Sequence, residues 1–385
     1  MMKELGEIIT GNTPSKKTEE FWNSEDICFI KPDIIADNGI NEIVDSNEYI
    51  SEDARKKARV VGKNSIFITC IGNIGKLGIA SDGEYAFNQQ INAIIPNDRV
   101  QPKYLAYNLL FNKARLVAMA NAPVVPIINK SQFGEFTVNI ETDIDRQNET
   151  VDVLDKLTQI IQQRNKEISA LDELIKARFV EMFGNTVTNP LNWEEHRLDE
   201  YIIFLTSGSR GWSQYFVDKE DELFITIKNV KNNHIILDNI QYIKAPNNKE
   251  AERTKVKDGD LLISITADLG RTGVVDSYIA EKGAYINQHL SLVRLDMNRI
   301  NPLYVSYFLE TESGKRQFES KNQNGVKAGL NFNAIKSLKI LVPPLEVQEL
   351  YLEFVAQVDK SKAAVQKALD ETQLLFDSLM QKYFG

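Results

Sequence analysis

The sequence is poor in the residues that build covalent or metal-held frameworks. It has two cysteines and three histidines among 385 residues. Cys28 and Cys70 lie within apolar, strand-like runs, which favours small buried hydrophobes over a redox or metal role. His196, His234 and His289 are too far apart in sequence to offer a zinc-binding spacing. The sequence therefore predicts neither a disulfide scaffold nor a metal site.

Long hydrophobic runs are also missing. No stretch of 18 apolar residues occurs, so no membrane-spanning helix is predicted. The opening residues 1–4 do not begin a signal peptide, and the cytoplasm is the expected compartment. With 43% hydrophobic and 26% charged residues, the composition is that of a soluble globular protein. The length suits two or three domains.

Acidic residues are in excess, but they are unevenly placed. The net charge is −9, and segments 141–184 and 345–385 carry −4 and −3 of it. The other 300 residues carry only −2, so the total charge does not exclude nucleic acid as a partner. Two basic stretches lie among them, although a solvated face is the simpler interpretation of each. They consist of Arg55, Lys56, Lys57, Arg59 and Lys63, and of Lys244, Lys249, Arg253, Lys255 and Lys257.

Motifs of catalysis are absent as well. The sequence has no G-x-x-x-x-G-K-[ST] phosphate loop and no G-x-G-x-x-G that opens a helix after a strand. It also lacks the Asn-Pro-Pro-aromatic stretch with which adenine methyltransferases hold a flipped base. Residues 207–211 resemble part of G-x-S-x-G, but a Gly/Ser turn is the better interpretation. No catalytic residue is predicted, and an enzyme with an unrecognised site is a minor alternative.

An internal repeat with a separation near 200 residues covers almost the whole chain. Residues 61–79 align without gaps on residues 256–274, and both contain an apolar strand followed by a Gly-basic-x-Gly turn. This ordered recurrence predicts a duplication, and the mixture of strand and helix signals predicts two mixed α/β domains. Other pairs recur in the same order: Asn88-Gln89 and Asn287-Gln288, Pro102–Tyr107 and Pro302–Tyr307, Asn129–Val138 and Asn331–Ile340, and Phe183-Gly184 and Phe384-Gly385.

Each copy ends in a long helical segment with a heptad pattern. Residues 145–183 contain no proline or glycine, and apolar residues recur every seven positions. Such a helix would be about 55–60 Å long at ~1.5 Å per residue. The predicted seam consists of Leu154, Leu157, Ile161, Ile168, Leu171 and Ile175 in the first copy, and of Val355, Val358, Val365, Leu369 and Phe376 in the second.

Three partners are open to these helices. Each could pack on its own domain, the two could pair with each other, or they could pair with another chain. Pairing of the two copies is favoured, because equivalent units most often associate about a two-fold axis. That axis would make the helices antiparallel and would place the globular parts at opposite ends of a rod. The expected fold class is therefore mixed, or α+β, with two globular α/β domains (1–140 and 185–342) joined by an antiparallel coiled coil of two long helices (141–184 and 343–385).

Several stretches resemble the specificity subunits of type I restriction-modification systems. Residues 5–15 (LGEIITGNTPS) and the aromatic pair Phe21-Trp22 are similar to the opening of that family. Residues 206–212 (TSGSRGW) resemble a recurrent start of its second variable domain. Residues 341–348 (LVPPLEVQ) resemble the Pro-Pro-Leu-x-x-Gln start of its conserved helix. The resemblance extends over essentially the whole chain.

The two helix starts depart from the family pattern. Val347 stands where the family usually has Glu, and the first copy lacks both prolines. Only Ile144 and Gln147 fit the pattern there. These departures concern the angle at which the first helix begins rather than the assignment.

The resemblance implies a division of labour among several subunits. Each of two target-recognition domains would read one half of a split, double-stranded DNA sequence. The paired helices would set the gap and dock two methylation subunits, through which motor-nuclease subunits attach. S-adenosylmethionine, ATP and Mg would belong to those partners, so this chain would hold no cofactor and catalyse nothing.

Candidate DNA contacts are polar side chains in loops, which can reach base edges or phosphates. Lys76 and Arg271 occupy the same position in the two Gly-basic-x-Gly turns, and both are expected to contact phosphates at their half-sites. The recurrent Asn88-Gln89-Gln90 and Asn287-Gln288-His289 are either a shared phosphate or flipped-base contact or plain turn structure. The predicted contacts are Lys16, Lys17, Lys31, Asn73 and Lys76 in the first domain, and Ser209, Arg210, Trp212, Lys228, Asn229, Lys231, Asn233 and Arg271 in the second.

A coiled-coil scaffold whose globular ends bind proteins is the alternative function. It would require neither base readout nor salt-sensitive DNA binding, and these two properties distinguish the hypotheses.

Overall fold

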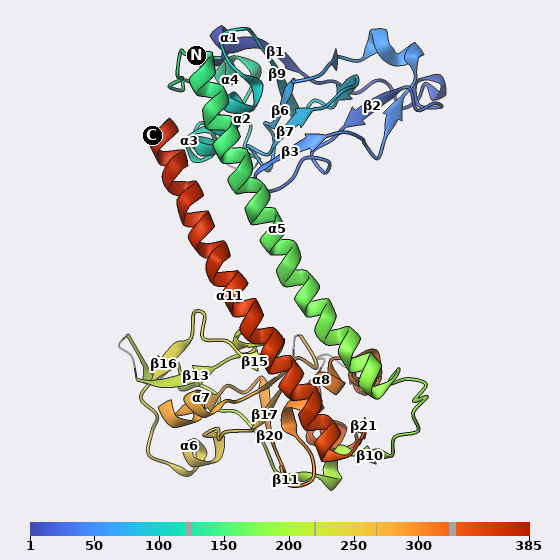
Figure 1. The fold of residues 1–385 in the computed structure, drawn as a ribbon, viewed down its shortest axis with the longest axis vertical. Helices are drawn as coiled ribbons and strands as arrows, with labels where there is room; N and C mark the ends of the chain where they lie inside the picture. Colours follow the sequence, from blue (N-terminus) through green and yellow to red (C-terminus); the bar gives the residue numbers. More distant parts are fainter. Residues whose placement is uncertain (121–124, 219–220, 267, 323–328) are drawn as a thin grey trace. The chain divides into compact units, whose positions relative to one another are not determined.

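The computed structural model describes residues 1–120, 125–218, 221–266, 268–322 and 329–385. The chain divides into two compact units (Figure 1). The first unit consists of Met1–Lys166 and Val365–Gly385, and the second of Glu167–Ala364. The units cut across the two long helices, whereas the predicted domain limits keep each helix whole.

The first unit contains two sheets within the described residues. Its strands are β1 (Gly6–Thr10), β2 (Ile27–Ile30), β3 (Ile40–Ile43), β4 (Tyr49–Ile50), β5 (Val60–Val61), β6 (Ile66–Thr69), β7 (Leu77–Ala80), β8 (Tyr85–Phe87) and β9 (Ile91–Pro96). One sheet has the order β1-β9-β6-β7-β3, in which only β7 and β3 are parallel. The other has the order β4-β2-β8-β5, in which only β2 and β8 are parallel.

The second unit repeats this topology. Its strands are β10 (Glu195–Arg197), β11 (Ile202–Ser207), β12 (Phe216–Val217), β13 (Glu222–Ile225), β14 (Val230–Lys231), β15 (Asn233–Ile235), β16 (Gln241–Ile243), β17 (Leu261–Ser264), β18 (Thr272–Val274), β19 (Ala284–Ile286), β20 (Leu290–Leu295) and β21 (Lys339–Leu341). The described sheets have the orders β11-β20-β17-β18-β15-β14, β12-β16-β13-β19 and β10-β21. The parallel pairs, β15 with β18 and β13 with β19, stand where the first unit has its own. The predicted duplication is confirmed at the level of strand order.

Short helices precede the long ones in both units. Pro102 and Pro302 occupy the first turn of α2 and α8, where a missing N–H costs nothing. Asn129 and Asn331 cap α4 and α10 with their side chains. The helices are α1 (Met2–Leu5), α2 (Pro102–Phe111), α3 (Lys113–Ala118), α4 (Lys130–Glu135), α5 (Ile144–Phe183), α6 (Lys249–Thr254), α7 (Ser277–Lys282), α8 (Pro302–Leu309), α9 (Glu312–Lys321), α10 (Phe332–Lys336) and α11 (Leu345–Phe384), with 3-10 helices η1 (Glu19–Phe21), η2 (Glu52–Lys57), η3 (Leu198–Glu200), η4 (Trp212–Tyr215) and η5 (Ile227–Asn229).

The largest core of each unit joins its first sheet to parts of both long helices. In the first unit, Ile66 of β6 and Leu105 of α2 share a buried cluster with Leu154 of α5 and Phe384 of α11. The second unit has an equivalent cluster around Leu261, Tyr304, Phe179 and Tyr351. In each unit, the sheet that contains β6 or β17 is therefore anchored to the helices by continuous apolar packing.

The two cysteines lie in or beside strands, and both are free thiols. Cys70 is buried in the first core, as predicted, and burial raises the pKa of its thiol to about 12. Cys28 lies in β2 but is only half-buried, unlike the other three residues of that strand.

The long helices α5 and α11 pack against each other in an antiparallel manner. In the first unit, Arg164 donates hydrogen bonds to the carbonyl of Ala368 and, at 2.6 Å, to Oγ1 of Thr372. In the second unit, Lys362 Nζ lies 2.5 Å from the carboxylate of Asp172. Later residues of α5 thus meet earlier residues of α11, which confirms the predicted antiparallel pairing.

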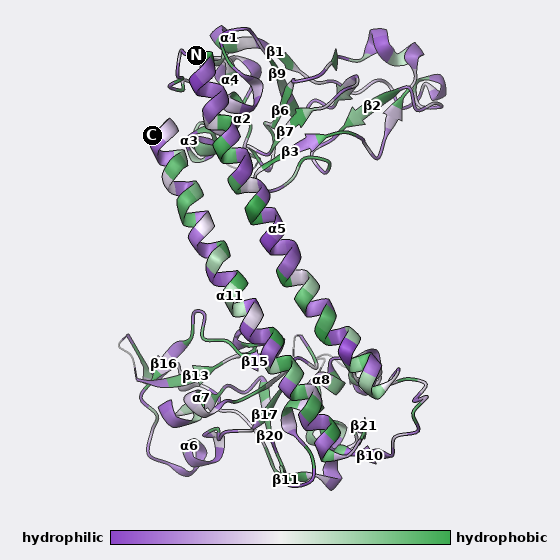
Figure 2. Ribbon diagram, in the orientation of Figure 1, coloured by the Kyte–Doolittle hydropathy of each residue, from purple (hydrophilic) through white to green (hydrophobic). Residues whose placement is uncertain are grey.

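The predicted seam is the less exposed side of both helices. Figure 2 shows hydrophobic and hydrophilic residues alternating along α5 and α11. Leu154, Leu157, Ile175, Val355 and Val358 are buried. The seam residues nearer the middle of each helix are only half-buried: Ile161, Ile168, Leu171, Val365, Leu369 and Phe376.

Candidate functional site

The two units build the ends of the equivalent strands β1 and β11 in the same way. Gly11 follows β1 and Gly208 follows β11. A Cβ atom at either glycine would lie 2.1 Å from a backbone oxygen, that of Asn88 in one case and of Asn287 in the other. Only glycine fits a backbone approach this close. The frame therefore delivers two different loops, residues 12–18 and 209–211, to equivalent places.

The recurrent Asn88 and Asn287 form identical turns. The side-chain oxygen of Asn88 accepts a hydrogen bond from the Gln90 N–H at 3.0 Å, and that of Asn287 accepts one from the His289 N–H at 3.1 Å. Their own N–H groups donate to the last residues of β2 and β13. This geometry accounts for the recurrence as turn structure and favours it over a DNA contact.

The two Gly-basic-x-Gly turns also share their backbone geometry. Gly75 and Gly270 have φ angles of +82° and +81°, which only glycine adopts readily. The hydroxyl of Thr69 accepts from the Lys76 N–H at 3.0 Å, and that of Ser264 accepts from the Arg271 N–H at 2.9 Å. The turns are equivalent, as the alignment predicts, although their basic side chains have different surroundings.

Lys76 is held inside its own domain. Its side chain is 11% exposed, and its Nζ lies 2.7 Å from a carboxylate oxygen of Asp37. The same amine donates to the carbonyls of Pro32 and Ile35 at 3.1 and 3.2 Å. These three acceptors use all three of its N–H groups, and the ion pair lowers the pKa of Asp37. The geometry argues against the predicted phosphate contact, because Lys76 instead links the turn before β7 to the loop 31–37.

The other predicted residues of the first domain are accessible. Lys16 and Lys31, far apart in sequence, both pair with the carboxylate of Glu48. The hydrogen bond from Lys31 lowers the pKa of Glu48, and it raises that of Lys31 itself. Lys17 is exposed and has no carboxylate partner among the described residues, while Asn73 is exposed beside Asp37.

Four predicted residues of the second domain are buried and have structural roles. Trp212 is 4% exposed and packs among aromatic rings in the core beside the sheet β12-β16-β13-β19. Asn229 accepts from the Thr226 N–H and closes its own turn, and Asn233 accepts from the Ser306 hydroxyl at 2.9 Å. The hydroxyl of Ser209 lies beside that of Thr254, away from solvent. Burial argues against direct DNA contact by these four, because a buried side chain cannot reach a base edge.

Four cationic residues of the second domain remain at the surface. Arg210, Lys228 and Lys231 are exposed, and the described part of the chain gives none of them a carboxylate partner. Arg271 is 39% exposed and pairs with Asp268 at 2.7 Å. The predicted DNA contacts whose side chains remain accessible to solvent are thus Lys16, Lys17, Lys31, Asn73, Arg210, Lys228, Lys231 and Arg271.

A buried glutamine joins each long helix to its domain. Gln147 accepts from the Gln101 N–H at 2.8 Å and donates to the Glu141 carbonyl at 2.6 Å. Gln348 accepts from the Asn301 N–H at 3.0 Å and donates to a carbonyl just before α11 at 2.8 Å. The sequence contains their signal, because glutamine is the last residue of the helix-start pattern in both copies.

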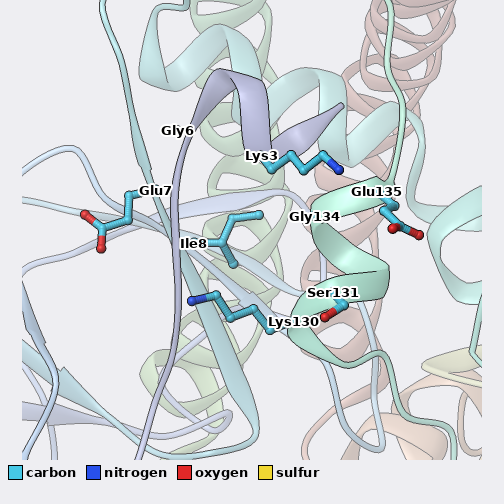
Figure 3. Close-up of a pocket in the computed structure, with 8 residues that line it drawn as sticks. All are labelled: Lys3, Gly6, Glu7, Ile8, Lys130, Ser131, Gly134 and Glu135. Carbon is cyan, nitrogen blue, oxygen red and sulfur yellow. The ribbon is translucent and has the colours of Figure 1, made fainter.

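A hollow of about 420 Å³ lies between β1 and α4. Figure 3 shows Ile8 pointing from β1 toward α4, while Glu7 points the other way. Its lining mixes both charges and includes no predicted DNA contact.

Among the described residues, no group of three or more His, Cys, Asp and Glu could hold a metal ion. Nor does any helix found there combine the length and apolarity of a membrane span.

Comparison with known proteins places this frame in a family. The profile described as "Type I restriction modification DNA specificity domain" matches residues 1–170 and 190–372. The chain belongs to this family. Like its relatives, the chain has two mixed α/β regions and two long helices packed together. The resemblance noted in the sequence is confirmed.

Individual relatives match parts of the chain. The type I restriction enzyme MjaIX specificity subunit of Methanocaldococcus jannaschii is 30% identical over 54% of this chain and 52% of its own length. The HindI specificity subunit of Haemophilus influenzae is 35% identical over 28% of this chain and 23% of its own. The matches thus span about half or less of these curated relatives.

The fold extends over the whole chain. A crystal structure of a type I restriction-modification S subunit from M. genitalium has a TM-score of 0.61. It is 15% identical and covers 100% of this chain and 95% of its own. At this identity the likeness concerns the fold alone.

Proposed function

We propose that this specificity-family chain binds double-stranded DNA and reads a split target, one half with domain 1–140 and the other with domain 185–342. One observation carries the proposal: an identical strand, glycine and turn frame supports different loops in the two units. Scaffolds position and loops contact, so this arrangement suits two independent readers.

The accessible loop residues match that role. Lys16 and Lys17 lie in the loop that follows Gly11, and Arg210 lies in the loop that follows Gly208. Arginine can bond guanine in the major groove, and lysine serves phosphates or guanine. Because the two loops differ in sequence, each half-site would have its own base preference.

The chain would act as the non-catalytic part of a larger complex in the cytoplasm. Two methylation subunits would dock on it, and motor-nuclease subunits would join through them. S-adenosylmethionine, ATP and Mg would be held by those partners. Equivalent exposed leucines support docking at two sites: Leu174 of α5 is 46% exposed and Leu375 of α11 is 50% exposed. Exposed apolar residues at matching positions are expected where two copies of one partner bind.

Domain exchange tests the proposal. Residues 185–342 are replaced by the corresponding domain of a relative, and methylated sites are mapped in cells that also make the partner subunits. One half of the methylated sequence should change, while the other half and the gap stay the same. A wild-type target without a gap, or an exchange that alters both halves, would contradict split reading. Absence of salt-dependent DNA binding would instead favour the protein-binding scaffold.

A further inference from the structure

Two exposed arginines, one in each unit, hold equivalent backbone carbonyls. Arg59 Nη1 donates to the carbonyl of Thr10, the last residue of β1. Arg253 Nη1 donates to the carbonyl of Ser207, the last residue of β11, at 2.7 Å. Both arginines are exposed to solvent. Each guanidinium is therefore fixed at the point where its unit's first loop begins.

The arginines do not align in the repeat. When the alignment of residues 61–79 with 256–274 is extended backwards, Arg59 falls opposite Thr254 and Arg253 falls opposite Ala58. Arg59 lies between η2 and β5, whereas Arg253 belongs to the last turn of α6. The two arginines are thus offset by one position in the repeat, yet both donate to the carbonyl that precedes the equivalent glycine.

Their positive charge is not neutralised by the contact they make. Arg253 Nη1 also donates to Oγ1 of Thr206, but carbonyl and hydroxyl oxygens are both neutral acceptors. Most of the five guanidinium donors and the whole formal charge therefore remain available. Arg55, four residues before Arg59, differs: it pairs with the carboxylates of Glu52 and Glu84. Lys255, two residues after Arg253, pairs with Glu222 at 3.5 Å.

Further cations lie close in sequence to both arginines. Lys56 and Lys57 precede Arg59, and Lys249 and Lys257 flank Arg253; all four are exposed. The described ranges of the chain give none of these lysines a carboxylate partner. Each arginine therefore lies in a local surplus of positive charge, beside a loop that the proposed function assigns to base reading.

We infer that Arg59 and Arg253 are matched phosphate clamps, one at each half-site, which fix the DNA backbone relative to the reading loops. A planar guanidinium forms two parallel hydrogen bonds to a phosphate, and one already held in place loses less side-chain entropy on binding. A contact to phosphate is blind to sequence, so both half-sites can use it. This inference rests on the proposed function, and it gives these two arginines the role that the sequence analysis assigned to Lys76 and Arg271.

Salt dependence of DNA binding tests the clamps. Full-length Arg59→Gln and Arg253→Gln variants are titrated with a fluorescein-labelled duplex of mixed sequence between about 50 and 200 mM salt. Each substitution should flatten the slope of log affinity against log salt by about 0.9, and should weaken binding about tenfold near 0.1 M salt. Arg59→Lys should retain most of the slope. With the partner subunits present, the mapped methylation sequence should stay the same.

Arg55→Gln and Lys255→Gln are the matched controls, since each removes one positive charge nearby that a carboxylate already compensates. Their slopes should remain close to the wild-type value, and circular dichroism checks that every variant is folded. Slopes of Arg59→Gln and Arg253→Gln that equal those of the controls would overturn the clamps, as would an altered base preference. If the wild-type chain binds no DNA, the proposed function itself is contradicted. If both arginine variants bind DNA normally, only the inference about the clamps is contradicted.

Discussion

At the scale of single residues, the buried glutamines decide how each long helix begins. Replacing Gln147 or Gln348 by leucine would strand the N–H of Gln101 or Asn301 without its acceptor. An unsatisfied buried group costs roughly 1–3 kcal/mol, so each variant should lose about that much free energy of unfolding in urea. Gln357→Leu, at an exposed position of α11, is the control and should change little. Equal losses for buried and exposed glutamines would contradict this role.

His196 should make the stability of the second unit depend on pH. Its ring nitrogens lie 3.0 Å from Glu200 and 3.2 Å from Glu194, and these hydrogen bonds, that to Glu200 first, raise its pKa above 6.5. A raised native pKa means that the stabilisation is fully present below about pH 6.5 and is lost as pH rises through the native value.

Urea unfolding of wild type and His196→Gln checks this dependence. The substitution should cost stability at about pH 6, where the histidine is charged in both states, and almost none at about pH 8.5. A difference between the two proteins that stayed constant across this range would show that the ion pairs contribute nothing.

At the scale of elements, the seam of α5 is strongest near its ends. Ile175 is 6% exposed within a large aromatic core, whereas Ile168 is only half-buried. Ile175→Ala should therefore cost about 2–4 kcal/mol of unfolding free energy, and Ile168→Ala clearly less. Urea titration of both variants measures the difference. Equal losses would mean that the middle of the seam is packed as tightly as its end.

The exposed leucines give a second prediction for the helices. Leu174 lies one residue before Ile175, but its side chain faces solvent. The Leu174→Asp substitution should therefore hardly change the free energy of unfolding of the chain alone. Co-purification of the methylation subunits should fall, because the substitution places a charge in the proposed docking surface. Full recovery of both partners would move that surface elsewhere.

Sequence periodicity predicted the helices and their pairing because burial on a helix repeats every seven residues. The two Gly-basic-x-Gly turns were also predictable from the sequence, since Gly75 and Gly270 are required by backbone geometry. Side-chain direction was not. Lys76 and Trp212 carry the same local signal as a surface lysine or a stacking tryptophan, and only the packing of distant strands buries them. The sequence did not predict the role of Arg59, because the carbonyl to which it donates lies 49 residues away in sequence.

At the scale of the whole molecule, duplication would allow the proposed DNA binding despite the acidic net charge. The negative charge is concentrated in the helices, while the repeated sheets carry exposed cations in loops. For a protein that neutralises phosphates at two equivalent places, affinity falls as the salt concentration rises. The slope of that fall should reflect the phosphate contacts at both places together. Combining Arg59→Gln with Arg253→Gln should therefore flatten the salt slope by about 1.8, twice the effect of either variant alone. A double variant no flatter than the single ones would show that only one half-site is held.

The helix pair should set the distance between half-sites. Residues 161–167 and 367–373 contain both partners of the bond between Arg164 and Thr372, so removing these two heptads together preserves the register of the rest. The pair shortens by about 10 Å, which corresponds to at most about three base pairs. Methylation mapping should show a shorter gap with both half-sequences unchanged. Removing residues 161–167 alone is the control: it leaves Thr372 without its partner and offsets the two seams, so methylation of the target should be lost. A wild-type gap after the paired deletion would show that the spacing is set by the domains and not by the helices.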